Sequence, residues 1–175
     1  MRRHQLGRTG MMVSPVIFAG IIVNGEQEDQ PTIEAYVAKA IEAGINYFDI
    51  APSYGNAQYN LGQALVPYRE AVYVACKTTE RSAEGAKREL DQSLRELKTD
   101  HFDVYQLHAL TTDEDIDQTF AKDGAFEIYL QAKDEGVIRN IGFSAHSERI
   151  ALRACERYDF DTILFPFNWA LGLET

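Results

Sequence analysis

The chain has 175 residues, of which 45% are hydrophobic and 25% are charged, and its formal net charge is −10. This length and composition predict one globular domain and exclude a disordered or low-complexity protein. The acidic balance argues against a nucleic-acid surface, which needs a clustered basic face, but it leaves room for a small anionic ligand held by a few local donors.

No stretch of the chain approaches the roughly 20 consecutive apolar residues that a membrane span requires. The N-terminal stretch MRRHQLGRTGMMVSP also lacks the apolar core of a secretory signal, so we expect a cytoplasmic protein. Its two cysteines, Cys76 and Cys155, are too few and too far apart for a disulfide framework. We expect them to be reduced thiols in the core or at an interface.

The first third of the chain predicts a turn, a strand, a helix and a second strand. The LGRTG stretch at residues 6–10 is typical of a hairpin turn, and the branched apolar run Val13–Gly20 predicts a strand. Residues 31–44 predict a helix, because apolar side chains recur at helical spacing between an initial proline and a final glycine. Residues 45–51 predict the next strand.

The rest of the chain continues the alternation of helices and strands. Helices are predicted at residues 60–66, 82–98, 125–136 and 148–158, and strands at residues 71–78, 101–110, 137–144 and 161–167. The strands read as continuous apolar runs, which is typical of a parallel sheet covered on both faces.

Two architectures fit this alternation: an open doubly wound sheet and a closed barrel of eight strand–helix units. No GxGxxG stretch follows the first strand, and reactive side chains recur at the carboxyl ends of successive strands, which favours the barrel. Such a barrel usually needs about 250 residues. The predicted fold class is therefore α/β, with a TIM (β/α)8-type barrel that is incomplete and has about six βα units.

Four ionisable side chains lie at, or just after, the carboxyl ends of neighbouring strands. Asp49 ends one strand, Tyr54 lies in the loop after it, and Lys77 and His108 end the next two strands. Adjacent strands lie about 4.8 Å apart, so these groups are expected to meet at one rim of the sheet. Lys77 would pair with the carboxylate of Asp49, which is costly to bury alone, and would favour the ionised form of Tyr54. Such a phenol is a candidate proton donor to a carbonyl oxygen.

Several stretches of the chain resemble the aldo-keto reductase family. They are LGRTG followed by a strand, the loop DIAPSYG, the lysine of CKT, the run SLRELKTDHFDVYQLH, and GFSAH after the fifth strand. The resemblance covers essentially the whole chain. It implies a single aldo-keto-reductase-like barrel domain over residues 1–175 that lacks the C-terminal units.

The resemblance implies an NADP(H)-dependent oxidoreductase that reduces aldehydes or ketones to alcohols without a metal. Tyr54 would be the general acid, and Lys77 and Asp49 would be the pair that tunes it. His108 would donate the hydrogen bond that orients the substrate carbonyl. The expected partner is a small carbonyl substrate rather than a nucleic acid or a membrane.

The resemblance also implies two contacts with the cofactor, from Ser144 to the nicotinamide carboxamide and from Asn168 in the loop after the sixth strand. The family usually has Ser-Asn where this chain has Ser144 followed by Ala145 and His146, and it often has Gln near the position of Leu164. The family's basic residues for the adenosine 2′-phosphate, which follow its eighth strand, have no counterpart here.

The open barrel edges of a truncated reductase predict self-association. Two alternatives to the reductase remain open. The chain could be a catalytically inactive, truncated homologue that acts as a binding or regulatory protein. A metal-dependent hydrolase could use Asp49, His108 and Asp103 as ligands, but the sequence has no HxH or HExxH spacing, and Lys77 would compete with a cation in the same pocket.

Overall fold

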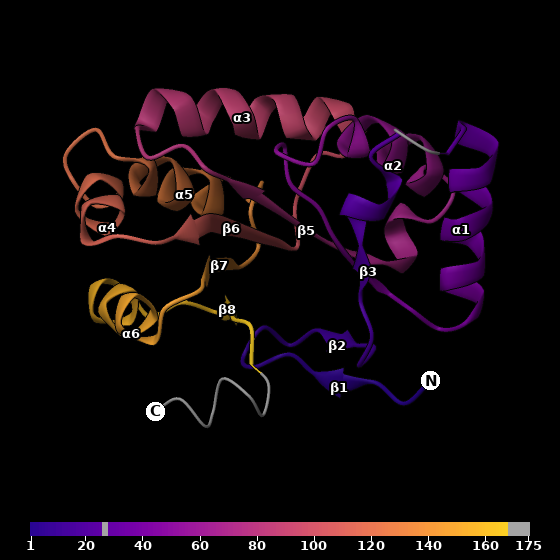
Figure 1. The fold of residues 1–175 in the computed structure, drawn as a ribbon, viewed down its shortest axis with the longest axis horizontal. Coiled ribbons are helices and arrows are strands. Elements are labelled where there is room, and N and C mark those ends of the chain that lie inside the picture. Colours follow the sequence, from indigo (N-terminus) through magenta and orange to yellow (C-terminus); the bar gives the residue numbers. More distant parts are fainter. Residues whose placement is uncertain (26–27, 168–175) are drawn as a thin grey trace.

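Six parallel strands form one curled sheet in the computed structural model, which describes residues 1–25 and 28–167 (Figure 1). The strands neighbour one another in chain order: β3 (Phe18–Ala19), β4 (Tyr47–Asp49), β5 (Tyr73–Thr78), β6 (Val104–Leu110), β7 (Ile141–Ala145) and β8 (Thr162–Leu164). This half-barrel of six strands and six α-helices confirms the predicted α/β fold of an incomplete TIM-type barrel.

Helical segments connect the strands and lie on the outside of the half-barrel (Figure 1). They are α1 (Gln30–Glu42), α2 (Ala57–Leu65), α3 (Ala83–Glu96), α4 (Asp113–Thr119), α5 (Ala125–Asp134) and α6 (Glu148–Arg157), with short 3₁₀ turns η1 (Gly20–Val23) and η2 (Arg69–Ala71). Within the described residues, none of these helices has the length and apolar character needed to span a bilayer.

Helix α4 was not predicted from the sequence, although its start carries a recognisable signal. The Thr112 side chain accepts a hydrogen bond from the backbone of Asp115, and the Asp115 side chain accepts one from the backbone of Thr112. This reciprocal capping box satisfies two backbone donors that the first turn of a helix leaves free. The cap therefore starts a helix of only seven residues in a stretch that has little apolar periodicity.

The predicted first strand, Val13–Gly20, is wrong over most of its length. Val13 belongs to β2 (Met12–Val13), which pairs antiparallel with β1 (His4–Gln5) around the predicted turn, and only β3 joins the parallel sheet. Pro15 interrupts the run because it has no backbone N–H to donate. The neighbouring Ser14 N–H donates to the Asn46 side chain instead, at 2.8 Å.

The β1–β2 hairpin is fastened to the chain just before β8 (Figure 1). Nη2 of Arg8 donates to the carbonyl of Phe160 at 2.9 Å, and Nε lies 3.4 Å from a carboxylate oxygen of Asp161. Asp161 also receives hydrogen bonds from Lys133 and from the backbone of Ile141, both at 2.9 Å. These contacts tie the first residues of the chain to the segment that precedes the last strand.

The two faces of the sheet carry separate apolar clusters. The larger cluster lies under the helices and includes Phe48, Cys76 and Phe143. A smaller cluster on the concave face contains Met11, Val13, Tyr47, Ala75 and Val104. Burial on both faces explains why the strands read as continuous apolar runs. Cys76 is buried, as expected of a core thiol, whereas Cys155 is exposed on α6.

Asp103, which immediately precedes β6, organises the amino-terminal end of the sheet. Its carboxylate is 2% exposed and accepts hydrogen bonds from the backbone of Val74 at 2.9 Å, from Arg69 at 3.2 Å and from Arg139 at 2.9 Å. One acid therefore connects β5, η2 and the segment before β7.

We expect Asp103→Ala to lower the free energy of unfolding by about 2–4 kcal/mol, because it leaves a largely buried guanidinium and a backbone N–H without their acceptor. Urea denaturation followed by circular dichroism measures the change. Asp100→Ala is the matched control, since the Asp100 side chain is 95% exposed and pairs with the adjacent His101. A loss at Asp103 no larger than the loss at Asp100 would contradict this anchoring role.

Candidate active site

The alternation of side chains along the strands brings an acid and an amine to the same rim of the half-barrel. Asp49 is the last residue of β4 and follows Tyr47 by two positions, and Lys77 follows Ala75 by two positions in β5. Tyr47 and Ala75 both face the concave side. Because side chains alternate with a period of two, Asp49 and Lys77 face that side as well, at the carboxyl ends of adjacent strands.

The Lys77 ammonium is fully buried and lies among three acceptors. Its Nζ atom is 2.5 Å from a carboxylate oxygen of Asp49, 3.1 Å from the carbonyl oxygen of Ile50 and 3.3 Å from the hydroxyl of Tyr54. Three acceptors match the three protons of an ammonium group. The acid and the phenol were predicted from the sequence, but the Ile50 carbonyl was not, since no residue type marks a backbone acceptor.

The Asp49–Lys77 pair sets the electrostatics of this rim. Burial raises the pKa of the Asp49 carboxyl above its ordinary value, and the charge and hydrogen bond of Lys77 oppose that rise. The Lys77 Nζ atom also lies 5.0 Å from the centre of the Tyr54 ring. Since the phenol oxygen accepts a hydrogen bond from the ammonium, its own O–H remains available to donate.

His108 reaches the same rim from β6. Its ring meets the Tyr54 ring edge to face, with 5.9 Å between the ring centres and 88° between the planes. Burial lowers the pKa of His108 to about 4, and the positive charges of Lys77 and Arg81 add to this effect. The imidazole is therefore neutral at pH 7 and carries one N–H donor. Its Nδ1 atom is buried and has no hydrogen-bond partner among the described residues.

Ser144 lies near the carboxyl end of β7 and is 5% exposed. Its hydroxyl oxygen accepts a hydrogen bond from the backbone of Ala109 at 2.8 Å, which leaves the hydroxyl proton free to donate. A free hydroxyl donor at this rim fits the amide oxygen of a nicotinamide. Asn168, the other predicted cofactor contact, lies outside the described residues.

The structure separates the residues considered as metal ligands. Asp103 lies at the amino-terminal end of the sheet and accepts a hydrogen bond from the first part of β5, whereas Asp49 and His108 lie at the opposite rim. The hypothesis that joined the three in one site is therefore wrong. Among the described residues, no cluster of three or more histidine, cysteine, aspartate or glutamate side chains has the arrangement of a metal site.

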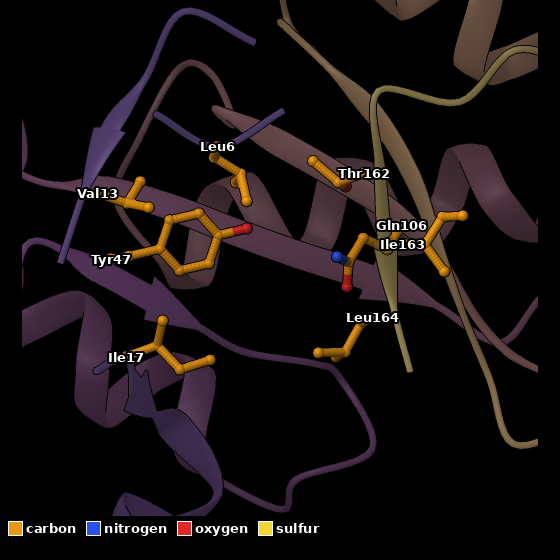
Figure 2. Close-up of a pocket in the computed structure, with 8 residues that line it drawn as sticks. All are labelled: Leu6, Val13, Ile17, Tyr47, Gln106, Thr162, Ile163 and Leu164. Carbon is orange, nitrogen blue, oxygen red and sulfur yellow. The ribbon is translucent and has the colours of Figure 1, made fainter. Parts of the chain in front are cut away.

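A cavity of about 140 Å³ opens on the concave face, where Tyr47 and Gln106, two positions before Asp49 and His108, contribute to its wall (Figure 2). It is lined by Leu6, Val13, Ile17, Tyr47, Gln106, Thr162, Ile163 and Leu164. Two polar atoms in its wall, Oε1 of Gln106 and Oγ1 of Thr162, are buried and have no partner among the described residues. Gln106 was not predicted from the sequence, although it lies two positions before His108 and the alternation of side chains along a strand puts both on the same face.

A parallel half-barrel with a lysine, a carboxylate and a phenol at the carboxyl ends of its strands is the architecture of the TIM-barrel class, whose reactive groups lie at that rim. The model of the aldo/keto reductase family matches residues 19–168. The chain therefore belongs to the aldo/keto reductase family.

Individual relatives agree with this assignment. The oxidoreductase YqkF of Bacillus subtilis is 29% identical over 96% of this chain and 56% of the relative. Among solved structures, PA4992 of Pseudomonas aeruginosa is 26% identical with a TM-score of 0.86, over 96% of this chain and 69% of that one. An aldo/keto reductase of Klebsiella pneumoniae, solved with NADP and acetate, is 25% identical with a TM-score of 0.72, over 89% of this chain and 53% of that one. The chain spans about half the length of the curated relatives it matches.

We expect His108 to titrate near pH 4 in the folded chain, because burial and the nearby cations disfavour its protonated form. Since this pKa lies below the ordinary value of about 6.5, the unfolded chain binds more protons between these pH values, and stability falls as the pH drops from about 6.5 towards 4. NMR titration of the histidine ring signals measures the midpoint, with His108→Gln as the assignment control. A midpoint near 6.5 would contradict the burial argument.

Proposed function

We propose that this chain carries the catalytic centre of an NADP(H)-dependent reductase that converts aldehydes or ketones to alcohols, with Tyr54 as the general acid. The observation that carries the proposal is the buried Lys77 ammonium, which lies within hydrogen-bond distance of both Asp49 and the Tyr54 hydroxyl. This contact gives a half-buried phenol a fixed cation on one side and leaves its proton free on the other.

In the proposed reaction the carbonyl carbon gains a hydride and the carbonyl oxygen gains the Tyr54 proton. Reduced nicotinamide, when bound, supplies the hydride. As Tyr54 releases its proton, Lys77 stabilises the phenolate that forms, and Asp49 balances the charge of the buried ammonium. Neutral His108 donates a hydrogen bond to the carbonyl oxygen, where negative charge develops.

Ser144 and Asn168 are the proposed cofactor contacts. Ser144 contributes its free hydroxyl proton, and the role of Asn168 rests on the family resemblance. The Klebsiella pneumoniae relative was solved with NADP, which supports a nicotinamide cofactor and makes NADP(H) the first one to test. The proposed location is the cytoplasm, where free thiols such as Cys76 and Cys155 stay reduced.

The same proposal treats residues 1–175 as a single barrel-type domain. The concave and convex clusters share one continuous sheet, which supports this organisation. The contacts of Lys77 with Asp49 and Tyr54 do not favour the alternative of an inactive binding or regulatory protein.

We expect Tyr54→Phe to reduce carbonyl turnover at least about 100-fold, because it removes the proton donor, together with one of the three acceptors of the Lys77 ammonium. NADPH oxidation with a panel of aldehydes and ketones measures turnover, and NADPH fluorescence measures binding separately. Tyr59→Phe is the matched control, since Tyr59 is 57% exposed and lies on the nearby α2. Equal activity in the Tyr54 variant would remove Tyr54 from the role of acid, and no turnover by the unaltered chain would overturn its proposed activity.

We also propose that the half-barrel self-associates through its edges. Within the described residues, β3 and β8 each have one neighbouring strand, so each presents unpaired backbone groups. Apolar side chains near these edges are exposed, including Ile17 at 40% and Ile163 at 50%. An exposed strand edge with apolar side chains favours pairing with a second copy of the chain.

We expect sedimentation velocity to show a mass that rises with protein concentration, and Ile163→Lys to weaken this rise, because a charge at a strand edge opposes edge-to-edge pairing. Leu130→Lys is the matched control, as Leu130 is 43% exposed on α5, which connects the inner strands β6 and β7. A folded chain that stays monomeric at every concentration would overturn the self-association.

A further inference from the structure

The backbone around His108 departs from regular strand geometry. The pairing of β6 with β7 shifts between Leu107 and Leu110, so the two residues between these positions form a bulge. Ala109 has a φ of +51°, a left-handed conformation that costs energy in any residue with a Cβ atom. Such a bulge changes the direction of the side chain beside it, and here that side chain is His108.

One arginine supplies hydrogen bonds to both carbonyl groups of the bulge. Arg81 follows β5 in the chain, and its side chain is 12% exposed. Its Nη2 atom donates to the carbonyl of His108 at 2.7 Å and to the carbonyl of Ala109 at 3.2 Å. Carbonyl groups that a bulge removes from regular strand pairing need another donor when they are shielded from water. Arg81 is that donor for both.

An acid at the start of α4 holds this arginine in turn. Oδ1 of Asp115 lies 3.3 Å from Nε of Arg81, while Oδ2 accepts hydrogen bonds from the backbones of Thr111 and Thr112 at 2.8 and 3.0 Å. Burial alone would raise the pKa of Asp115, but the hydrogen bonds from Thr111 and Thr112 and the charge of Arg81 lower it to about 2. Asp115 is therefore ionised throughout the neutral range and holds Arg81 at a fixed place.

The groups that surround His108 come from three sides. Lys77 faces it from β5, Arg81 from the loop after β5, and His146 from the loop after β7, while the Tyr54 ring contacts it edge to face. Arg81 thus acts on His108 in two ways. It donates a hydrogen bond to the backbone carbonyl of His108, and its positive charge disfavours protonation of the imidazole ring.

We propose that Arg81 is a positioning residue, which fixes the β6 bulge through its paired hydrogen bonds and so aims His108 at the Lys77–Tyr54 rim, with Asp115 as its anchor. The consequence for carbonyl reduction rests on the function proposed above. The fixing of the bulge does not depend on that function, and it is measurable without substrate.

The test compares Arg81→Gln and Arg81→Lys, with Arg88→Gln as the control, because Arg88 is 62% exposed and contacts Glu80 on the surface. In Arg81→Gln we expect faster amide hydrogen exchange at Ala109 and a His108 titration midpoint raised by roughly one pH unit. Lysine restores the positive charge but lacks the planar guanidinium group, whose N–H donors reach both carbonyl groups of the bulge. Arg81→Lys should therefore recover the low midpoint while the fast exchange at Ala109 persists.

Steady-state kinetics complete the test. We expect Arg81→Gln to lower kcat/KM for a carbonyl substrate about tenfold or more. If Arg81→Gln does not fold, Asp115→Asn is the second variant, and it should produce smaller changes in the same direction. Unchanged Ala109 exchange and an unchanged His108 midpoint in a folded variant would overturn the positioning role. If the variants change Ala109 exchange and the His108 midpoint as expected, but the unaltered chain reduces no carbonyl substrate, the proposed function is overturned and the positioning role of Arg81 is not.

Discussion

The ion pair between Lys77 and Asp49 is the contact on which the organisation of the rim depends. An ammonium group that is fully buried persists only where its charge is balanced and its protons are accepted. Both conditions require β4 and β5 to be adjacent, parallel and in the observed register. A slip of one residue would turn Lys77 towards the apolar cluster under the helices, so the chemistry of the rim and the register of the sheet constrain each other.

Much of the fold follows from patterns that are local in the sequence. The continuous apolar runs indicated buried parallel strands, and each of the six runs contributes a strand to the sheet, the first of them only through Phe18–Ala19. The acid of YFDIA and the lysine of CKT could be paired from the sequence, because adjacent parallel strands bring their carboxyl ends together and a buried acid needs a counter-charge. These inferences need only the order of the strands and the alternation of side chains between the two faces of each strand.

The errors concern features that depend on contacts distant in the chain. Asp103 was considered, and disfavoured, as a metal ligand beside Asp49 and His108. Its partners Arg69 and Arg139 lie 34 and 36 positions away and hold it at the other end of the sheet. Likewise, the bulge that directs His108 depends on an arginine 27 positions earlier. The hairpin was expected from its turn, but not the interruption of the next strand, where Ser14 bonds to a side chain instead of a neighbouring strand.

The link between Arg8 and the carbonyl of Phe160 joins positions that are 152 residues apart. During synthesis, the hairpin therefore cannot meet its counterpart until residue 160 has emerged from the ribosome. The central strands have neighbours much closer in sequence and can pair earlier. The hairpin is thus expected to be fastened after the central strands have paired, and until then Met11 and Val13 do not cover the apolar side chains of the concave face.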